Sequence, residues 1–150
     1  MNDELTPILR NIEESDAIIL GSPIYLGTVT GKMRSFLERL LFPYLTYTDP
    51  IQSLFPKQIK TGFIYTMNIS KEQLDEYGYT TMFETNENYL KMLFGSAESL
   101  MSFDTYQFND YSKVVADRFD ADKKAKRRVE IFPIDCRRAF EMGVRFTHDF

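Results

Sequence analysis

The residues of this 150-residue chain that could do chemistry together lie in one short segment, Pro23 to Thr30, which reads PIYLGTVT. Tyr25 could lie against a planar ring, and the hydroxyl groups of Thr28 and Thr30 could reach polar atoms at the edge of that ring. Gly27 has no side chain, so the backbone could approach a ligand closely there. Taken singly, these residues also have structural explanations: a core aromatic, a loop hydroxyl and a helix cap. Together in one loop they favour the binding of a flat ligand with a polar edge.

This loop is predicted to join a buried strand to an amphipathic helix. Residues 17–20 form a continuous apolar run, which is typical of a parallel strand covered on both faces. Gly21 and Pro23 are expected to end the strand, because proline has no N–H to donate. A helix is expected from Gly31, with Thr30 as its N-cap. Its apolar face would consist of Met33, Phe36, Leu37, Leu40 and Leu41. In open α/β sheets ligands bind beyond the carboxyl ends of the strands, where this loop lies.

The strand, loop and helix, with SPIYLGTVTG at their centre, resemble the second flavin-contacting loop of flavodoxin-like proteins. They are most similar to NAD(P)H-dependent FMN reductases and iron-sulfur flavoproteins. In those families the matching segment wraps the isoalloxazine ring, so the resemblance implies FMN as the cofactor and NAD(P)H as the electron donor. The ring's polar edge needs backbone donors, and the positive end of a helix favours an anionic reduced flavin. The implied cofactor-binding residues are Ser22, Pro23, Ile24, Tyr25, Leu26, Gly27, Thr28, Val29 and Thr30.

Two further strands are predicted, and the resemblance covers them at lower specificity. Residues 60–68 have the apolar core and polar exit of a parallel strand. Its end is expected to line the neighbourhood of the flavin through Tyr65, Thr66, Met67 and Asn68. Residues 99–108 are expected to form a third strand, with Asp104 to Gln107 completing the same edge of the sheet.

Helices are expected to alternate with these strands. The first covers residues 3–14 with Leu5, Ile8, Leu9 and Ile12 inward, or a shorter stretch with Thr6 as N-cap and Pro7 at its first position. Others are expected at 86–94 and at 135–146, with a short helix after Ser70 that ends at Gly78. The last long helix is expected to bury Cys136, Ala139, Phe140, Gly143 and Val144. This alternation predicts a single α/β domain over residues 1–150, a three-layer sandwich with a parallel sheet. The resemblance implies that the sandwich is flavodoxin-like.

The resemblance also implies parts that this sequence does not show. In the resembling families a strand, a Ser/Thr/Gly-rich loop that cradles the FMN phosphate, a helix and a second strand come first. Neither a G-x-G-x-x-G nor a G-K-[ST] run is present as a substitute phosphate site. We therefore expect an N-terminally truncated domain that binds FMN weakly or not at all.

The strand at residues 17–20 would then be an apolar edge of the sheet. Exposed edges of this kind invite pairing with another chain, so a homo-oligomer is expected. The main functional hypothesis is an FMN-binding oxidoreductase whose partners are flavin and small-molecule electron donors and acceptors. The alternative is a flavin-free binding or assembly module that acts through its sheet edge.

Composition excludes several other functions. Cys136 is the single cysteine, so an iron–sulfur cluster held within this chain lacks ligands, and a reducing cytoplasm is the expected location. The single histidine, His148, leaves no metal cluster or Ser-His-Asp arrangement to propose. No apolar run approaches the length that spans a membrane. The net charge of −4 opposes general nucleic-acid binding.

One basic cluster, Lys123 to Arg128, departs from this acidic balance. Asp117, Asp120, Asp122 and Glu130 flank it. Acids so close in sequence favour a solvated, partly neutralised surface. A site for a nicotinamide 2′-phosphate or another anion is the alternative interpretation, since arginine pairs well with phosphate.

Overall fold

A computed structural model describes residues 3–148 of the chain. A four-stranded sheet in the order β2-β1-β3-β4 forms its middle layer. The three long strands, β1 (Ala17–Tyr25), β3 (Ile59–Thr66) and β4 (Gly95–Ser102), run parallel. The short β2 (Thr28–Val29) pairs antiparallel with the end of β1.

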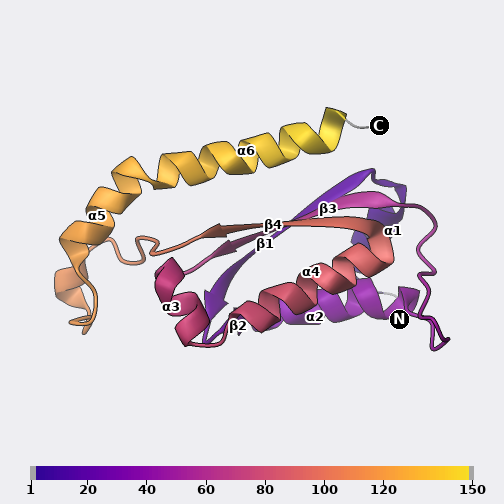
Figure 1. The fold of residues 1–150 in the computed structure, drawn as a ribbon, viewed down its shortest axis with the longest axis horizontal. Coiled ribbons are helices and arrows are strands. Elements are labelled where there is room, and N and C mark those ends of the chain that lie inside the picture. The colour runs from indigo at the N-terminus through magenta and orange to yellow at the C-terminus, as the bar shows by residue number, and fades with distance from the viewer. Residues whose placement is uncertain (1–2, 149–150) are drawn as a thin grey trace.

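Helices cover both faces of this sheet. In Figure 1, α6 (Phe132–His148) lies over one face, and α2 (Gly31–Leu41) and α4 (Thr80–Phe94) lie over the other. The remaining helices are α1 (Thr6–Glu14), α3 (Lys71–Glu76) and α5 (Ala121–Glu130), with short 3-10 turns at η1 (Phe42–Tyr44) and η2 (Tyr111–Lys113). The predicted three-layer α/β architecture is confirmed.

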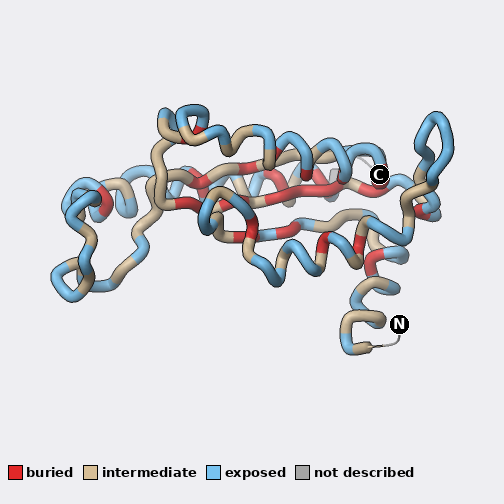
Figure 2. The backbone as a smooth tube through the Cα atoms, turned by 90° about the horizontal axis from the view of Figure 1, so that it is seen from below, coloured by how far each residue is buried: buried red, intermediate tan, exposed pale blue. Residues whose placement is uncertain are grey.

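The larger hydrophobic core lies between the sheet and the pair α2 and α4. Its most deeply buried members are Leu37, Leu40, Phe63, Tyr65, Leu90 and Phe94. Figure 2 shows that buried positions concentrate along the strands and on the helix faces turned toward them. A smaller cluster of Leu100, Met142 and Phe146 joins α6 to the opposite face of the sheet. Close approach of α6 depends on Gly62, since a Cβ there would lie 2.8 Å from the sulfur of Met142.

Several predicted boundaries were wrong. β1 does not stop at Gly21 but continues through Pro23 to Tyr25. Proline is tolerated at position 23 because, among the described residues, β1 pairs there only with β3 and its pairing with β2 begins at Ile24. β4 ends at Ser102, so residues 103–110, expected to continue a strand up to residue 108, leave the sheet. α4 begins at Thr80, six residues before the predicted start, and α1 has Leu5 rather than Thr6 at its N-cap.

The edge of the sheet at β1 is open, as predicted. Residues Ala17 to Pro23 pair with β3 on one side. On the other side, within residues 3–148, the only ladder partner of β1 is β2, at Ile24 and Tyr25. The side chain of Ile19 in this stretch is 45% exposed.

The predicted buried face of the last helix was wrong for Cys136 and Phe140 and right for Ala139. The positions of α6 that pack inward are Asp135, Ala139, Met142 and Phe146, while Cys136 is exposed and Phe140 is 72% exposed. Both stripes have helical spacing, so periodicity could not decide between them. The stripe that contains Met142 fits the space left by Gly62 and therefore faces the sheet. Within residues 3–148, no helix combines the length and apolar character needed to cross a membrane.

The exposure of Cys136 can be tested by chemical labelling. A thiol-specific chromogenic reagent should modify the native chain without denaturant, because an exposed thiol is accessible to it. The reaction is followed by absorbance, with Cys136→Ser as the unreactive control. Labelling that occurs only after unfolding would show that Cys136 is buried, as the sequence predicted.

Candidate functional site

The carboxyl ends of the three parallel strands meet at one edge of the sheet. Pro23 of β1 pairs with Thr66 of β3, which pairs with Ser102 of β4. In Figure 1 these ends point toward α3 and α5. We call residues 22–30, 65–68 and 102–107, which surround these ends, the carboxyl rim. The rim brings together the three segments that sequence analysis assigned to one site.

The first rim segment forms a tight hairpin. Tyr25 pairs with Thr28, and the two residues between them, Leu26 and Gly27, have φ angles of 53° and 81°. Two consecutive positive φ values are typical of a type I′ turn, which matches the twist of the paired strands. Tyr25 is 58% exposed, and Leu26 and Thr28 are also exposed. Tyr25 is therefore not a core aromatic, and these three side chains are accessible to a ligand.

The structure shows a reason for glycine at position 27 that was not predicted from the sequence. A Cβ at this position would lie 2.5 Å from a ring carbon of Tyr79, at the start of α4. The positive φ adds backbone strain for any other residue. The space beside Gly27 is thus filled by Tyr79, which holds the hairpin against the end of α4.

Other members of the predicted loop site are internal. Ser22 is buried, and its Oγ accepts a hydrogen bond from the N–H of Thr30 at 3.1 Å. Thr30 in turn caps α2, since its Oγ1 accepts from the N–H of Met33 at 3.2 Å. Val29 is buried in the core. Ser22, Val29 and Thr30 therefore position the hairpin relative to α2, and the predicted N-cap is confirmed.

The second rim segment divides between the core and the edge. The Tyr65 side chain is completely buried, stacks on Phe63 with ring centroids 4.1 Å apart and accepts a 3.3 Å hydrogen bond from Asn86. This burial raises the pKa of the Tyr65 phenol. Met67 is buried as well. The side chains of Tyr65 and Met67 therefore lie in the core and do not face the rim. Side chains alternate along a strand, which turns Thr66 to the other face.

A buried lysine ties the second and third rim segments together, although it belongs to the basic cluster that the sequence predicted to be a solvated surface. The Lys124 side chain, from α5, is only 3% exposed. Its ammonium donates to Oδ1 of Asp104 at 2.5 Å and to the side-chain and backbone oxygens of Asn68 at 2.5 and 3.2 Å. In addition, the N–H of Thr105 donates to the carbonyl of Met67 at 3.0 Å. The loops after β3 and β4 are thereby joined to each other and to α5.

A second charged cluster lies beside it. Asp135 of α6 is buried and accepts hydrogen bonds from Ser102 Oγ at 2.8 Å and from Arg127 at 3.1 Å. Arg138 lies 3.7 Å from the other carboxylate oxygen. This cluster joins α5, α6 and the end of β4.

The clusters border a cavity of about 350 Å³. We call it the arginine pocket. Its lining residues are Thr66, Thr105, Tyr106, Gln107, Asn109, Arg127, Arg128 and Phe132. None of them is acidic. The pocket contains Thr66 and residues 105–107 of the rim, together with two arginines from the basic cluster.

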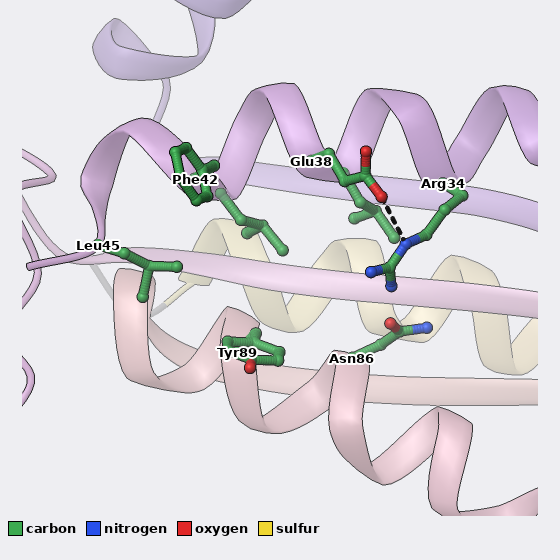
Figure 3. Close-up of a pocket in the computed structure, with 8 residues that line it drawn as sticks. Arg34, Glu38, Phe42, Leu45, Asn86 and Tyr89 are labelled. Atoms are coloured by element: carbon green, nitrogen blue, oxygen red, sulfur yellow. Dashed lines mark hydrogen bonds and ion pairs between the residues drawn. The ribbon is translucent and has the colours of Figure 1, made fainter. Parts of the chain in front are cut away.

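A different cavity lies between α2 and α4. Figure 3 shows Arg34 and Glu38 of α2 on one side and Asn86 and Tyr89 of α4 on the other. Its volume is about 180 Å³, and its charges form a 3.0 Å ion pair between Arg34 and Glu38. This cavity lies on the face of the sheet that α2 and α4 cover, and its lining includes no residue of the carboxyl rim. Within residues 3–148 there is also no group of three or more His, Cys, Asp or Glu that could hold a metal ion.

Comparison with known proteins agrees with the strand, loop and helix that carry the rim. Residues 1–58 match the family model of the NADPH-dependent FMN reductases. The resemblance to this family is confirmed over that segment. Two iron-sulfur flavoproteins of Archaeoglobus fulgidus are 48% and 38% identical to this chain over 42 and 37 residues, which are 28% and 25% of this chain. The matched segments cover 19% and 18% of those proteins, so this similarity spans about a fifth of their length.

Solved structures agree with the fold over a longer range. An NAD(P)H:quinone oxidoreductase from Methanothermobacter marburgensis has a TM-score of 0.59 at 13% identity, over 74% of this chain and 58% of that one. An FMN-dependent NADH-azoreductase from Bacillus anthracis, solved with FMN, has a TM-score of 0.56 at 12% identity, over 90% and 61%. The chain therefore has a flavodoxin-like α/β fold with a mostly parallel sheet.

The joining role of Lys124 can be tested through stability. Lys124→Met should lower the free energy of unfolding by about 3 kcal/mol, the low end for breaking a buried ion pair, because Asp104 keeps some solvent contact. Lys123→Met, next to it on the exposed side of α5, should change stability by less than about 0.5 kcal/mol. Urea denaturation compares the two. Equal losses would show that the ammonium does not hold the loops.

Proposed function

We propose that this chain provides the ring-binding part of an FMN-dependent oxidoreductase that takes electrons from NAD(P)H. The observation that carries the proposal is the exposed Tyr25 at the tip of β1, beside the carboxyl ends of β3 and β4. The family match over residues 1–58 includes this hairpin. The electron acceptor and the activity of the whole protein are part of the proposal.

The accessible side chains of the hairpin suit a flavin ring. Tyr25 offers an aromatic face, Leu26 an apolar surface and Thr28 a hydroxyl group, and all three are exposed. When bound, FMN supplies hydride chemistry, which the protein supports by holding the ring and leaving one face open. Pro23 and Ile24 bring Tyr25 to the rim, and Gly27 keeps the turn closed against Tyr79. The chain's role in this proposal is binding and orientation.

Replacing Tyr25 separates ligand binding from folding. Tyr25→Ala should weaken riboflavin binding by roughly 1–3 kcal/mol, because an aromatic stacking surface is lost. Since Tyr25 is exposed, the free energy of unfolding should change by less than about 0.5 kcal/mol. Flavin fluorescence measures binding and urea denaturation measures stability.

Tyr47→Ala is the matched control. Tyr47 is also exposed and lies in the segment between η1 and β3, at the other end of the sheet. This variant should bind riboflavin as the wild type does. No flavin binding by the wild type, or equal binding by Tyr25→Ala, would contradict the proposed site. Gly27→Val is unsuitable as a probe, because it would disturb Tyr79 and the turn.

The open edge of β1 favours a second candidate function, assembly with a second copy of this chain. Residues 17–23 leave one side of the strand without a ladder partner among the described residues, and Ile19 is partly exposed there. Unpaired backbone groups on an apolar edge favour the addition of another strand.

Light scattering after size exclusion tests this assembly. The wild type should be a dimer, and Ile19→Lys should shift it toward monomer, because a charge on an edge strand opposes pairing. Ile51→Lys, another exposed isoleucine in the segment before β3, is the control and should remain dimeric. A monomeric wild type would rule out assembly through this edge.

A further inference from the structure

We propose that the arginine pocket binds the phosphomonoester group of a nucleotide. The basic residues Arg127 and Arg128 reach this pocket from α5 and meet polar side chains that follow β3 and β4. The proposal deepens the proposed function, because a flavin mononucleotide and a nicotinamide dinucleotide phosphate both carry such a group. It does not depend on flavin binding at Tyr25.

The arginine pocket is positively charged. The chain as a whole has a net charge of −4, yet the pocket lining contains two guanidinium groups and no carboxylate. Asp135 compensates Arg127 at 3.1 Å, but the same carboxylate is also near Arg138 at 3.7 Å. Within residues 3–148, no carboxylate forms an ion pair with Arg128. The pocket therefore keeps positive charge that an anion can balance.

Both arginines of the pocket are held in place by neighbouring side chains. The Arg128 guanidinium lies over the ring of Tyr106, 5.2 Å from its centroid, and the Arg127 side chain is only 15% exposed and fixed by Asp135. A guanidinium has five N–H donors in a planar fork. Stacking and a single ion pair leave several donors available, and held arginines lose little side-chain entropy when they bind phosphate.

The loop that closes the pocket is also held in place. The N–H of Gln107 donates to the hydroxyl oxygen of Tyr111 at 3.1 Å. The ring of Tyr111 contacts those of Tyr106 and Phe108, with centroids 5.2 and 5.3 Å apart. Ser112 donates to Asp110, which lowers the pKa of that carboxyl group. These contacts hold the wall formed by residues 105–109 against η2.

Size and remaining chemistry indicate the class of ligand. A volume of about 350 Å³ is at the small end for ligand pockets, which span about 300–1,000 Å³. The hydroxyl group of Thr66 and the amide groups of Gln107 and Asn109 could complete the hydrogen bonds of phosphate oxygens, whereas the Thr105 hydroxyl already donates to the carbonyl of Met67 at 3.1 Å. Phe132 and Tyr106 offer aromatic surface for the adjoining part of a nucleotide. A phosphomonoester carries nearly two negative charges near neutral pH, which matches two arginines.

Two pairs of ligands, in which the members differ by one phosphomonoester, test the proposal. They also identify which molecule supplies the phosphomonoester. Calorimetric titration of the full chain compares NADP⁺ with NAD⁺, and FMN with riboflavin. In at least one pair the phosphorylated ligand should bind roughly tenfold more tightly, and added salt should reduce the difference. A preference in the first pair assigns the pocket to the dinucleotide, and one in the second assigns it to the flavin.

Variants connect this preference to the pocket. Arg128→Gln should abolish the preference, whereas Arg137→Gln, an exposed arginine of α6 outside the pocket lining, should retain it. Asn109→Asp, which adds a negative charge to the pocket wall, should also abolish it and serves if Arg128→Gln does not fold. No preference in either pair, or a preference that survives Arg128→Gln or Asn109→Asp, overturns the proposal. A chain that prefers NADP⁺ but does not bind riboflavin would contradict the proposed flavin site and leave the arginine pocket supported.

Discussion

The burial of the Lys124 ammonium is the constraint on which the arrangement of the rim depends. An ammonium group removed from water costs several kcal/mol unless other charges and oxygens replace its hydration. Here Asp104 and both oxygens of Asn68 do so. These partners come from the loops after β4 and β3, so the two loops have to converge on α5. The left-handed backbone of Asp104, with φ 48°, brings its carboxylate to this meeting point.

The position of α5 then determines what surrounds the rim. With Lys124 held inward, Arg127 and Arg128 lie one turn further along the helix and reach the neighbouring cavity. Arg127 and Asp135 join α5 to α6, and Ser102 ties the same carboxylate to the end of β4. Met142 of α6 fits against Gly62 on the sheet. The same helix thus supplies one buried cation that organises loops and two that face a pocket. Arg127 does both, since it pairs with Asp135 at the junction with α6 and also lines the pocket.

Some features next to the hairpin were predicted correctly from the sequence. The strand at residues 17–20, the Thr30 cap and the apolar face of α2 follow from local patterns, and the structure confirms them. The strand is not covered on both faces as predicted, since Ile19 is 45% exposed. The short capped helix after Ser70 is confirmed as well, with a capping box to Gln73. Tyr65 could not be placed by the same reasoning. A residue near the end of a strand can face the core or the rim, and its direction depends on the packing of Phe63 and α4 around it.

The sequence by itself determined the alternating α/β order, the layered architecture and the segments that lie at the carboxyl ends of the strands. Hydrophobic periodicity and the turn-forming Gly and Pro residues are local signals, so they can be read without the tertiary structure. Only the tertiary structure decided which charges are buried. Lys124 and Asp135 look like surface residues in the sequence. Asp104, 20 residues from Lys124, and Ser102, 33 residues from Asp135, help to hold them inside. It also decided that α6 exposes Cys136 and buries Met142, because the choice between two apolar stripes depends on the shape of the sheet surface they meet.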